Sequence, residues 1–176
     1  MRAQGAKASE IRAIQATLTP VDSLFEALDD AQYAQESIAE TLTAKRAIFT
    51  QMDEAAPADC ILASSCSSIP PSEFLAGLDG ERRTLVAHPF NPPHLIPLVE
   101  LVPAPATDPQ AIARARKLLS DCGQHPVLLH KPVEGFIGNR LQAAVVSEIM
   151  HLIGEGVASP EDIDACLRIG LGLRWS

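Results

Sequence analysis

The sequence predicts an α/β protein with a mostly parallel sheet, followed by a segment that is entirely helical. Short apolar runs with strand character alternate with amphipathic helical segments up to about residue 130, and only helical patterns follow. Alternation of this kind is typical of parallel sheets. The 176 residues suffice for one domain, or for one domain and part of another. We therefore expect a doubly wound sheet with the first helices of an all-α domain appended.

The predicted strands are short apolar runs, several of them rich in β-branched residues. They cover residues 14–18, 33–38, 60–63, 84–87, 96–102 and 126–129. The first is the weakest, and it ends at Thr19-Pro20 because proline disfavours a helical residue before it. A proline-rich loop at 89–93 can be neither a helix nor an inner strand, so it separates two of the strands.

The predicted helices are recognised by their start signals and apolar periodicity. They cover residues 7–13, 24–28, 40–53, a segment from Asp108, residues 136–153 and a segment from Ser159. Asp108 and Ser159 are capping residues, and each precedes a proline at the first helical position. The helix 136–153 is the longest and is mostly apolar, so we expect it to be well buried.

The composition excludes several classes of partner. The net charge is −8, from 22 acidic and 14 basic residues, which argues against a nucleic-acid partner or an anionic membrane. No stretch approaches the roughly 20 apolar residues that span a bilayer, and the N-terminus lacks a signal-peptide core. The four cysteines have no paired spacing, which favours reduced thiols in the cytoplasm. His88, His94 and a cysteine lack the spacing of metal ligands, so no metal is expected.

Polar residues stand at the ends of predicted strands, where open α/β sheets bind their ligands. Ser67 follows the strand 60–63, and His88 ends the strand 84–87. If the two strands that flank the proline loop run antiparallel, a turn centred near His94 places His88 opposite Glu100. A carboxylate beside an imidazole fixes its tautomer and raises its basicity, as proton transfer requires.

On spacing alone, a solvent-facing strand glutamate and a loop histidine are the commoner arrangement. Asn139 is a polar residue in an apolar helix start, and a simple hydrogen bond at the helix end is again the commoner explanation. A hydrolase triad of Ser67, His88 and Glu100 would need a Gly-x-Ser-x-Gly elbow, which the sequence around Ser67 does not have.

Three blocks of sequence occur in order: AHPFNPP at 87–93, PLVELV at 97–102 and GFIGNR at 135–140. Together they resemble the 3-hydroxyacyl-CoA dehydrogenase family, and most of all its branch containing lambda-crystallin and L-gulonate 3-dehydrogenase. The resemblance extends from about residue 20 to the last residue. It implies an incomplete Rossmann-like sheet, with a partial NAD-binding domain over 1–132. The start of a helical domain for substrate binding and dimerisation then covers 133–176.

The resemblance also implies an activity and a set of roles. The substrate would be a 3-hydroxyacyl-CoA or another 3-hydroxy acid, the cofactor NAD, and the assembly a homodimer. His88 would take the proton of the C3 hydroxyl, with Glu100 orienting it. Ser67 and Asn139 would hold the reacting oxygen and the local water. The residues matched to cofactor contacts are Glu40, Lys45, Ser67 and Asn91.

One feature of the family has no counterpart near the start of this sequence. The family begins with a strand, a Gly-x-Gly-x-x-Gly turn and a helix that receives the pyrophosphate. The two Gly-x-Gly pairs here, at 154–156 and 170–172, both follow helices. We therefore expect a fragment that is inactive alone, with strand 33–38 at an open sheet edge. The alternative is a non-catalytic remnant or a structural, crystallin-like protein of the same fold.

Overall fold

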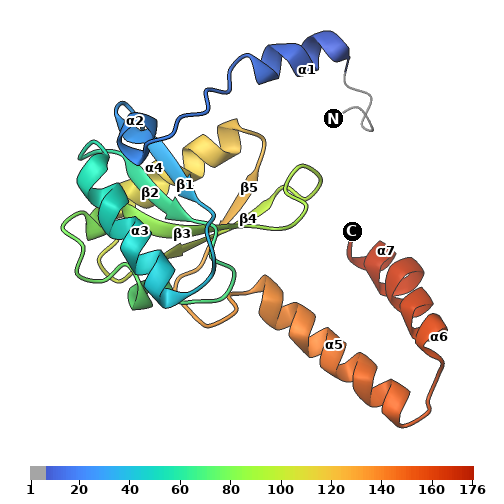
Figure 1. Cartoon of the computed structure of the whole chain (residues 1–176). Helices are drawn as coiled ribbons and strands as arrows, with labels where there is room; N and C mark the ends of the chain where they lie inside the picture. The colour runs from blue at the N-terminus through green and yellow to red at the C-terminus, as the bar shows by residue number, and fades with distance from the viewer. Residues whose placement is uncertain (1–6) are drawn as a thin grey trace.

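A single five-stranded sheet forms the centre of the computed structural model, which describes residues 7–176. The strands lie in the order β1-β2-β3-β4-β5 (Figure 1). They are β1 (Tyr33–Glu36), β2 (Ile61–Ser64), β3 (Thr84–Pro89), β4 (Leu98–Pro103) and β5 (His125–Leu128). All neighbours pair in parallel except β3 and β4. The mostly parallel α/β architecture predicted from the sequence is therefore confirmed.

The antiparallel pair β3 and β4 has the register that the spacing predicted. His88 is the partner of Glu100, and the residues on either side follow the same register. The proline-rich loop connects the two strands. Its first residue, Pro89, is still the last residue of β3 and the partner of Val99, whereas Pro92 and Pro93 lie outside the ladder, where no N–H is needed. This register sets the two candidate catalytic residues side by side on neighbouring strands.

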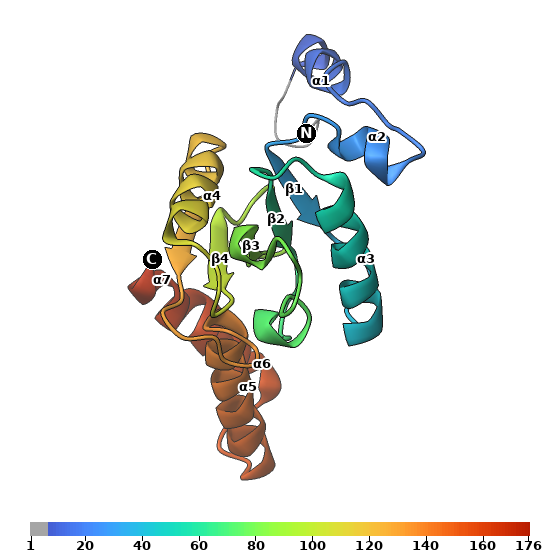
Figure 2. The same ribbon diagram turned by 90° about the vertical axis from the view of Figure 1, so that its left-hand side faces the viewer.

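Helices cover both faces of the sheet. Helix α3 (Leu42–Ala55) packs on one face and α4 (Pro109–Asp121) on the other, as Figure 2 shows. Successive residues of β2 point to opposite faces, so Leu62 joins Phe49 of α3 while Ala63 joins Ala115 of α4. Burial on both faces explains why this strand is a continuous apolar run instead of an alternating one.

The two helices next to the sheet begin at residues whose side chains cap them. The Thr41 hydroxyl accepts a hydrogen bond from the N–H of Ala44, and the Asp108 carboxylate accepts one from Gln110. Helix α3 therefore begins two residues later than expected, and Glu40 lies in the loop before it. The short α2 (Leu24–Leu28) is capped by Ser23 and packs against α3. Two 3₁₀ turns, η2 (Pro71–Glu73) and η3 (Glu81–Arg83), lie between β2 and β3.

The prediction of a strand at residues 14–18 is wrong. Helix α1 (Ala8–Gln15) includes the first of these residues, and none of its side chains is buried. The helix lies apart from the sheet (Figure 1). Ile14 and Leu18 are 45% and 68% exposed. Their apolar side chains are therefore not buried against the sheet, and nothing favours a strand at this position. Local helical hydrogen bonds, such as Ala16 N–H to Arg12 carbonyl, satisfy the backbone instead.

The C-terminal part is helical as predicted, but its longest helix is not buried. Helix α5 (Gly138–Gly154) leads away from the sheet, and α6 (Pro160–Ala165), the π-helical turn η4 (Cys166–Leu171) and α7 (Gly172–Trp175) return beside it (Figure 1). No residue of α5 is buried, because α6 and η4 cover only part of its surface. None of the described helices is long and apolar enough to cross a bilayer.

Helix α5 also begins two residues later than predicted. Gly135 and Phe136 have φ angles of 71° and 50°, in the left-handed region that a right-handed helix cannot include. Phe136 is nevertheless fully buried. Burial of its ring in the core offsets the cost of this backbone conformation.

The open edge of the sheet at β1 generates a prediction about self-association. The carbonyls of Gln32 and Glu36 point to β2, so the N–H of Gln35 points to the open edge. We expect the 176-residue chain to associate at micromolar concentration through this edge. Gln35→Pro should reduce the association, because it removes an edge donor without breaking the ladder.

Gln35→Val is the matched control, because it loses the same side-chain hydrogen bonds but keeps the N–H. Sedimentation velocity over a concentration series measures the effect. A monomeric wild-type chain with a sharp two-state melt would contradict the prediction.

Candidate active site

His88 and Glu100 form a buried pair at the end of β3. The distance from His88 Nδ1 to Glu100 Oε2 is 2.8 Å, and the two residues are 6% and 1% exposed. An ionised carboxylate can only accept hydrogen bonds, so Nδ1 carries the proton and its N–H group donates a hydrogen bond to Glu100. The Nε2 atom then keeps its lone pair, and no hydrogen bond from the described residues engages it. An imidazole held in this way can act as a general base.

The second oxygen of Glu100 binds the start of helix α5. Oε1 accepts hydrogen bonds from the N–H of Ile137 at 2.8 Å and of Gly138 at 3.0 Å. The first N–H groups of a helix have no partner inside the helix and carry partial positive charge. Glu100 therefore has partners for both oxygens, which a buried carboxylate needs to remain ionised without a large cost.

Two aromatic rings lie next to the imidazole. The ring centroids of Phe90 and Phe136 are 5.3 Å and 5.7 Å from that of His88, both in tilted geometry. Phe90 follows β3, whereas Phe136 comes from the turn before α5. These rings exclude water from the imidazole faces, which strengthens the hydrogen bond to Glu100.

A second carboxylate, that of Glu40, is held by the loop after β2. Its Oε1 accepts hydrogen bonds from the N–H of Ser67 at 3.1 Å, and from the N–H and hydroxyl of Ser68 at 2.9 Å and 2.8 Å. Burial raises the pKa of the Cys66 thiol, which stays protonated and donates to the same oxygen. Partial burial also raises the pKa of Glu40, but the hydrogen bonds from this loop outweigh it and lower the pKa below its ordinary value. A fixed anion thus stands at the carboxyl edge of the sheet.

Asn139 connects this loop to helix α5. Its side-chain amide donates a hydrogen bond to the carbonyl of Ser67 at 2.8 Å. The preceding residues, Ile137 and Gly138, bind Glu100. The start of α5 therefore joins the His88–Glu100 pair to the loop that holds Glu40, so four of the predicted site residues lie in one connected network with His88.

Lys45 and Asn91 lie differently from the other predicted residues. Lys45 is 1% exposed, and its Nζ is 2.8 Å from both oxygens of Glu36, which also accepts a hydrogen bond from Ser64 at 2.6 Å. Its ammonium is thus neutralised inside the protein. Asn91 is exposed in the loop after β3, and its side chain makes no hydrogen bond to a described residue. The cofactor contacts of both residues stay predictions.

The sequence reasoning missed Glu36, Ser64, Phe90, Phe136 and the backbone donors of α5. The role of Glu36 could have been inferred from the sequence, because an acidic residue at the end of a buried strand needs a cation as its partner. The two phenylalanines carried no signal, because nothing local distinguishes a ring beside a histidine from any core aromatic.

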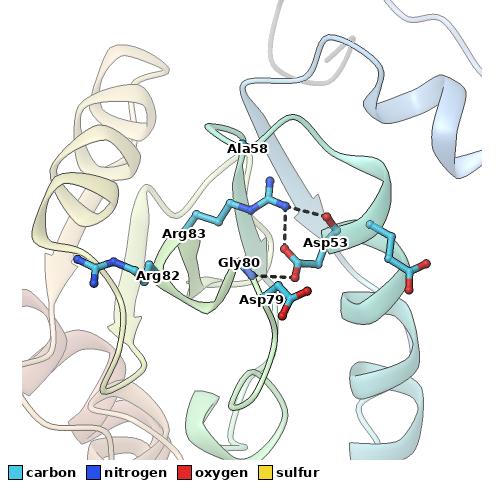
Figure 3. Close-up of a pocket in the computed structure, with 7 residues that line it drawn as sticks. Asp53, Ala58, Asp79, Gly80, Arg82 and Arg83 are labelled. Carbon is cyan, nitrogen blue, oxygen red and sulfur yellow. Dashed lines mark hydrogen bonds and ion pairs between the residues drawn. The ribbon is translucent and has the colours of Figure 1, made fainter.

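A separate pocket lies at the amino ends of β2 and β3 (Figure 3). Arg83 forms an ion pair of 2.7 Å with Asp53, whose other oxygen accepts a hydrogen bond from the Gly80 N–H at 2.9 Å. These charged groups satisfy one another and fasten α3 to the start of β3. Ligands of open α/β sheets bind at the carboxyl ends of the strands, so we assign this pocket a structural role.

The sequence matches two family descriptions. Residues 1–132 match "3-hydroxyacyl-CoA dehydrogenase, NAD binding domain" and residues 135–176 match "3-hydroxyacyl-CoA dehydrogenase, C-terminal domain". A lambda-crystallin homolog from Bos taurus is 46% identical over 153 residues, which are 87% of this chain and 48% of the bovine protein. An L-carnitine dehydrogenase from Pseudomonas sp is 42% identical over 164 residues, 93% of this chain and 51% of that protein. The chain thus spans about half the length of these relatives.

Solved structures agree with these matches. The crystal structure of 3-hydroxybutyryl-CoA dehydrogenase from Escherichia coli K12 superposes with a TM-score of 0.85 at 33% identity, over 95% of this chain and 35% of that one. An NAD+-dependent FHMPC 5-dehydrogenase superposes with a TM-score of 0.82, also at 33% identity, over 88% of this chain and 50% of that one. The Rossmann-like class predicted from the sequence is therefore confirmed.

The hydrogen bonds to Glu40 generate a prediction about pH and stability. Glu40→Gln should be less stable than the wild-type chain near neutral pH by about 0.5–1 kcal/mol, a modest value because Glu40 is exposed. A lowered folded pKa stabilises the protein above the unfolded pKa, and this contribution is lost as the pH falls through the folded value. The difference between the two proteins should therefore disappear in acid.

Urea unfolding at a series of pH values between about 3 and 7 measures this difference. Glu54→Gln is the control, since Glu54 is an exposed glutamate on α3 without a side-chain hydrogen bond to any described residue. A loss of stability in Glu40→Gln that does not vary with pH would contradict the prediction.

Proposed function

Because this chain belongs to the 3-hydroxyacyl-CoA dehydrogenase family, we propose that it forms the catalytic part of an NAD-dependent oxidoreductase. The reaction is oxidation of the C3 hydroxyl of a 3-hydroxyacyl-CoA or another 3-hydroxy acid. Residues 1–132 contribute a partial NAD-binding domain, and residues 133–176 begin the helical domain. The observation that carries the proposal is the buried 2.8 Å pair of His88 and Glu100, whose imidazole has Nε2 available as a base.

The mechanism follows from the tautomer of His88. The Nδ1–H group of His88 donates a hydrogen bond to Glu100 and keeps its proton, so the free Nε2 takes the proton of the C3 hydroxyl as a carbonyl forms. NAD, when bound, supplies the acceptor for the hydride. Glu100 stabilises the imidazolium that develops, and the N–H groups of Ile137 and Gly138 keep Glu100 oriented. Asn139 and Ser67 hold the substrate oxygen and its water beside the base.

The polar side chains at the carboxyl edge of the sheet fit the half of NAD that carries the nicotinamide and its ribose. Only Oε1 of Glu40 is used by the described protein atoms, so Oε2 can accept hydrogen bonds from ribose hydroxyls. Ser67 and the exposed Asn91 offer a hydroxyl and an amide at the same edge of the sheet. In the structure the ammonium of Lys45 is paired with Glu36. It can contact a ribose only if that ion pair opens. The sequence holds no glycine-rich turn before β1 that would bind a pyrophosphate.

The substrate, the assembly and the compartment are parts of the same proposal. Relatives named L-carnitine dehydrogenase and 3-hydroxyacyl-CoA dehydrogenase support a small 3-hydroxy substrate. The exposed apolar side chains of α5, Leu141, Val146 and Met150, support burial against a second protomer in a homodimer. The four cysteines are unpaired, which supports a reducing compartment such as the cytoplasm.

The histidine base is tested by substitution in a protein that contains this chain and turns over substrate. His88→Gln should lower kcat by about 10²–10⁴-fold with little change in KM, because the lost proton transfer belongs to the transition state. Glu100→Gln should also act mainly on kcat. The double mutant should be hardly slower than His88→Gln, since the two residues act as a unit.

His94→Gln is the control, because His94 is an exposed histidine in the nearby loop between β3 and β4. Strictly additive losses would mean that Glu100 acts independently of His88. A normal kcat in Glu100→Gln would return Glu100 to the role of an ordinary strand residue.

Cofactor affinity distinguishes an active dehydrogenase part from a crystallin-like structural protein. Each missing charge-assisted hydrogen bond to the pyrophosphate is worth about 1.5–3 kcal/mol, so the 176-residue chain should bind NAD no more tightly than about 1 mM. The same chain with a glycine-rich strand–turn–helix unit added before β1 should bind NAD far more tightly and produce NADH. Calorimetry and absorbance measure the two effects. If the protein with the added unit binds NAD but never reduces it, the structural alternative is favoured.

A further inference from the structure

Gly138, the first residue of α5, is packed against the ring of Phe90. A Cβ built at residue 138 would overlap the Cζ, Cε1 and Cε2 atoms of that ring. Its φ angle is not in the left-handed region, so the backbone conformation alone does not require glycine. The space favours it, because a side chain at 138 fits only if the Phe90 ring or the start of the helix moves.

The Phe90 ring is held from the other side as well. Its centroid lies 5.3 Å from that of His88, and its N–H donates to the carbonyl of Leu98 at 3.1 Å, which fixes the residue at the start of β4. The ring therefore contacts the catalytic imidazole and the start of α5 together.

The same helix start orients Glu100. Both donors to Oε1, the N–H groups of Ile137 and Gly138, lie within the segment that packs on Phe90. A displacement of α5 by the width of a methyl group would lengthen these hydrogen bonds beyond normal contact. Glu100 would then be free to rotate away from Nδ1 of His88.

We propose that Gly138 and Phe90 are positioning residues, whose contact places the α5 start on Glu100 and thereby holds His88 in the Nδ1–H tautomer. The catalytic consequence rests on the proposed function, but the geometric effect does not. A side chain at 138 displaces either the helix or the ring. The first change removes donors from Glu100, and the second removes the wall beside His88.

The test is the imidazole nitrogen NMR spectrum of the 176-residue chain, which reports the tautomer of His88 and the exchange of its Nδ1 proton. His88→Gln identifies the signals. Gly138→Ala should speed exchange of this proton about tenfold or more, the effect of weakening one hydrogen bond, and should populate the other tautomer. Gly154→Ala, at the far end of the same helix, is the matched control, because its Cβ meets no described atom within 4 Å.

The double mutant Phe90→Ala/Gly138→Ala separates positioning from a general loss of folding, because it makes room for the new methyl group. We expect it to recover the wild-type tautomer, because the start of α5 can return to Glu100, even if Gly138→Ala alone does not fold. Exchange of the Nδ1 proton should stay faster than in the wild-type chain, because the ring beside His88 is missing. Gly138→Ala with wild-type exchange would overturn the proposal, as would a folded double mutant that does not recover the wild-type tautomer. These readouts need no turnover, so they stay decisive even if His88→Gln leaves activity unchanged and the proposed function fails.

Discussion

The buried carboxylate of Glu100 holds together three parts of the chain that are distant in sequence. One oxygen accepts a hydrogen bond from His88 on β3, and the other accepts hydrogen bonds from two N–H groups at the start of α5. A carboxylate with 1% exposure must have partners for both oxygens or cost several kcal/mol. The direction of α5, the tautomer of His88 and the pairing of β3 with β4 are therefore linked through one side chain.

Three glutamates near the carboxyl edge of the sheet act in different ways because their surroundings differ. Glu36 is neutralised by Lys45 in a buried ion pair, which holds the loop after β1 but offers nothing to a ligand. Glu40 is exposed and is held by the loop after β2. Glu100 is buried with an imidazole. Burial and hydrogen-bond partners, which the residue type alone does not reveal, distinguish the structural ion pair of Glu36, the exposed carboxylate of Glu40 and the proposed catalytic partner Glu100.

The start of α5 is constrained by several contacts at once. Phe136 is buried at a φ of 50°, Gly138 lies against Phe90, and Asn139 binds the carbonyl of Ser67. Beyond this turn the helix has few contacts, and its apolar residues Leu141 and Met150 are each 63% exposed. The helical segment is thus held most firmly where it meets the sheet, close to His88.

The sequence by itself determined the features that depend on local pattern. Apolar runs located the five strands, the caps Asp108 and Ser159 located the starts of two helices, and the separation of twelve positions between His88 and Glu100 around a proline loop predicted their pairing. Only the tertiary structure decided the rest. The strand at 14–18 did not form, α5 was exposed, and Lys45 was paired with Glu36. Each of these outcomes depends on which tertiary contacts form and which are absent, and propensity and periodicity do not encode them.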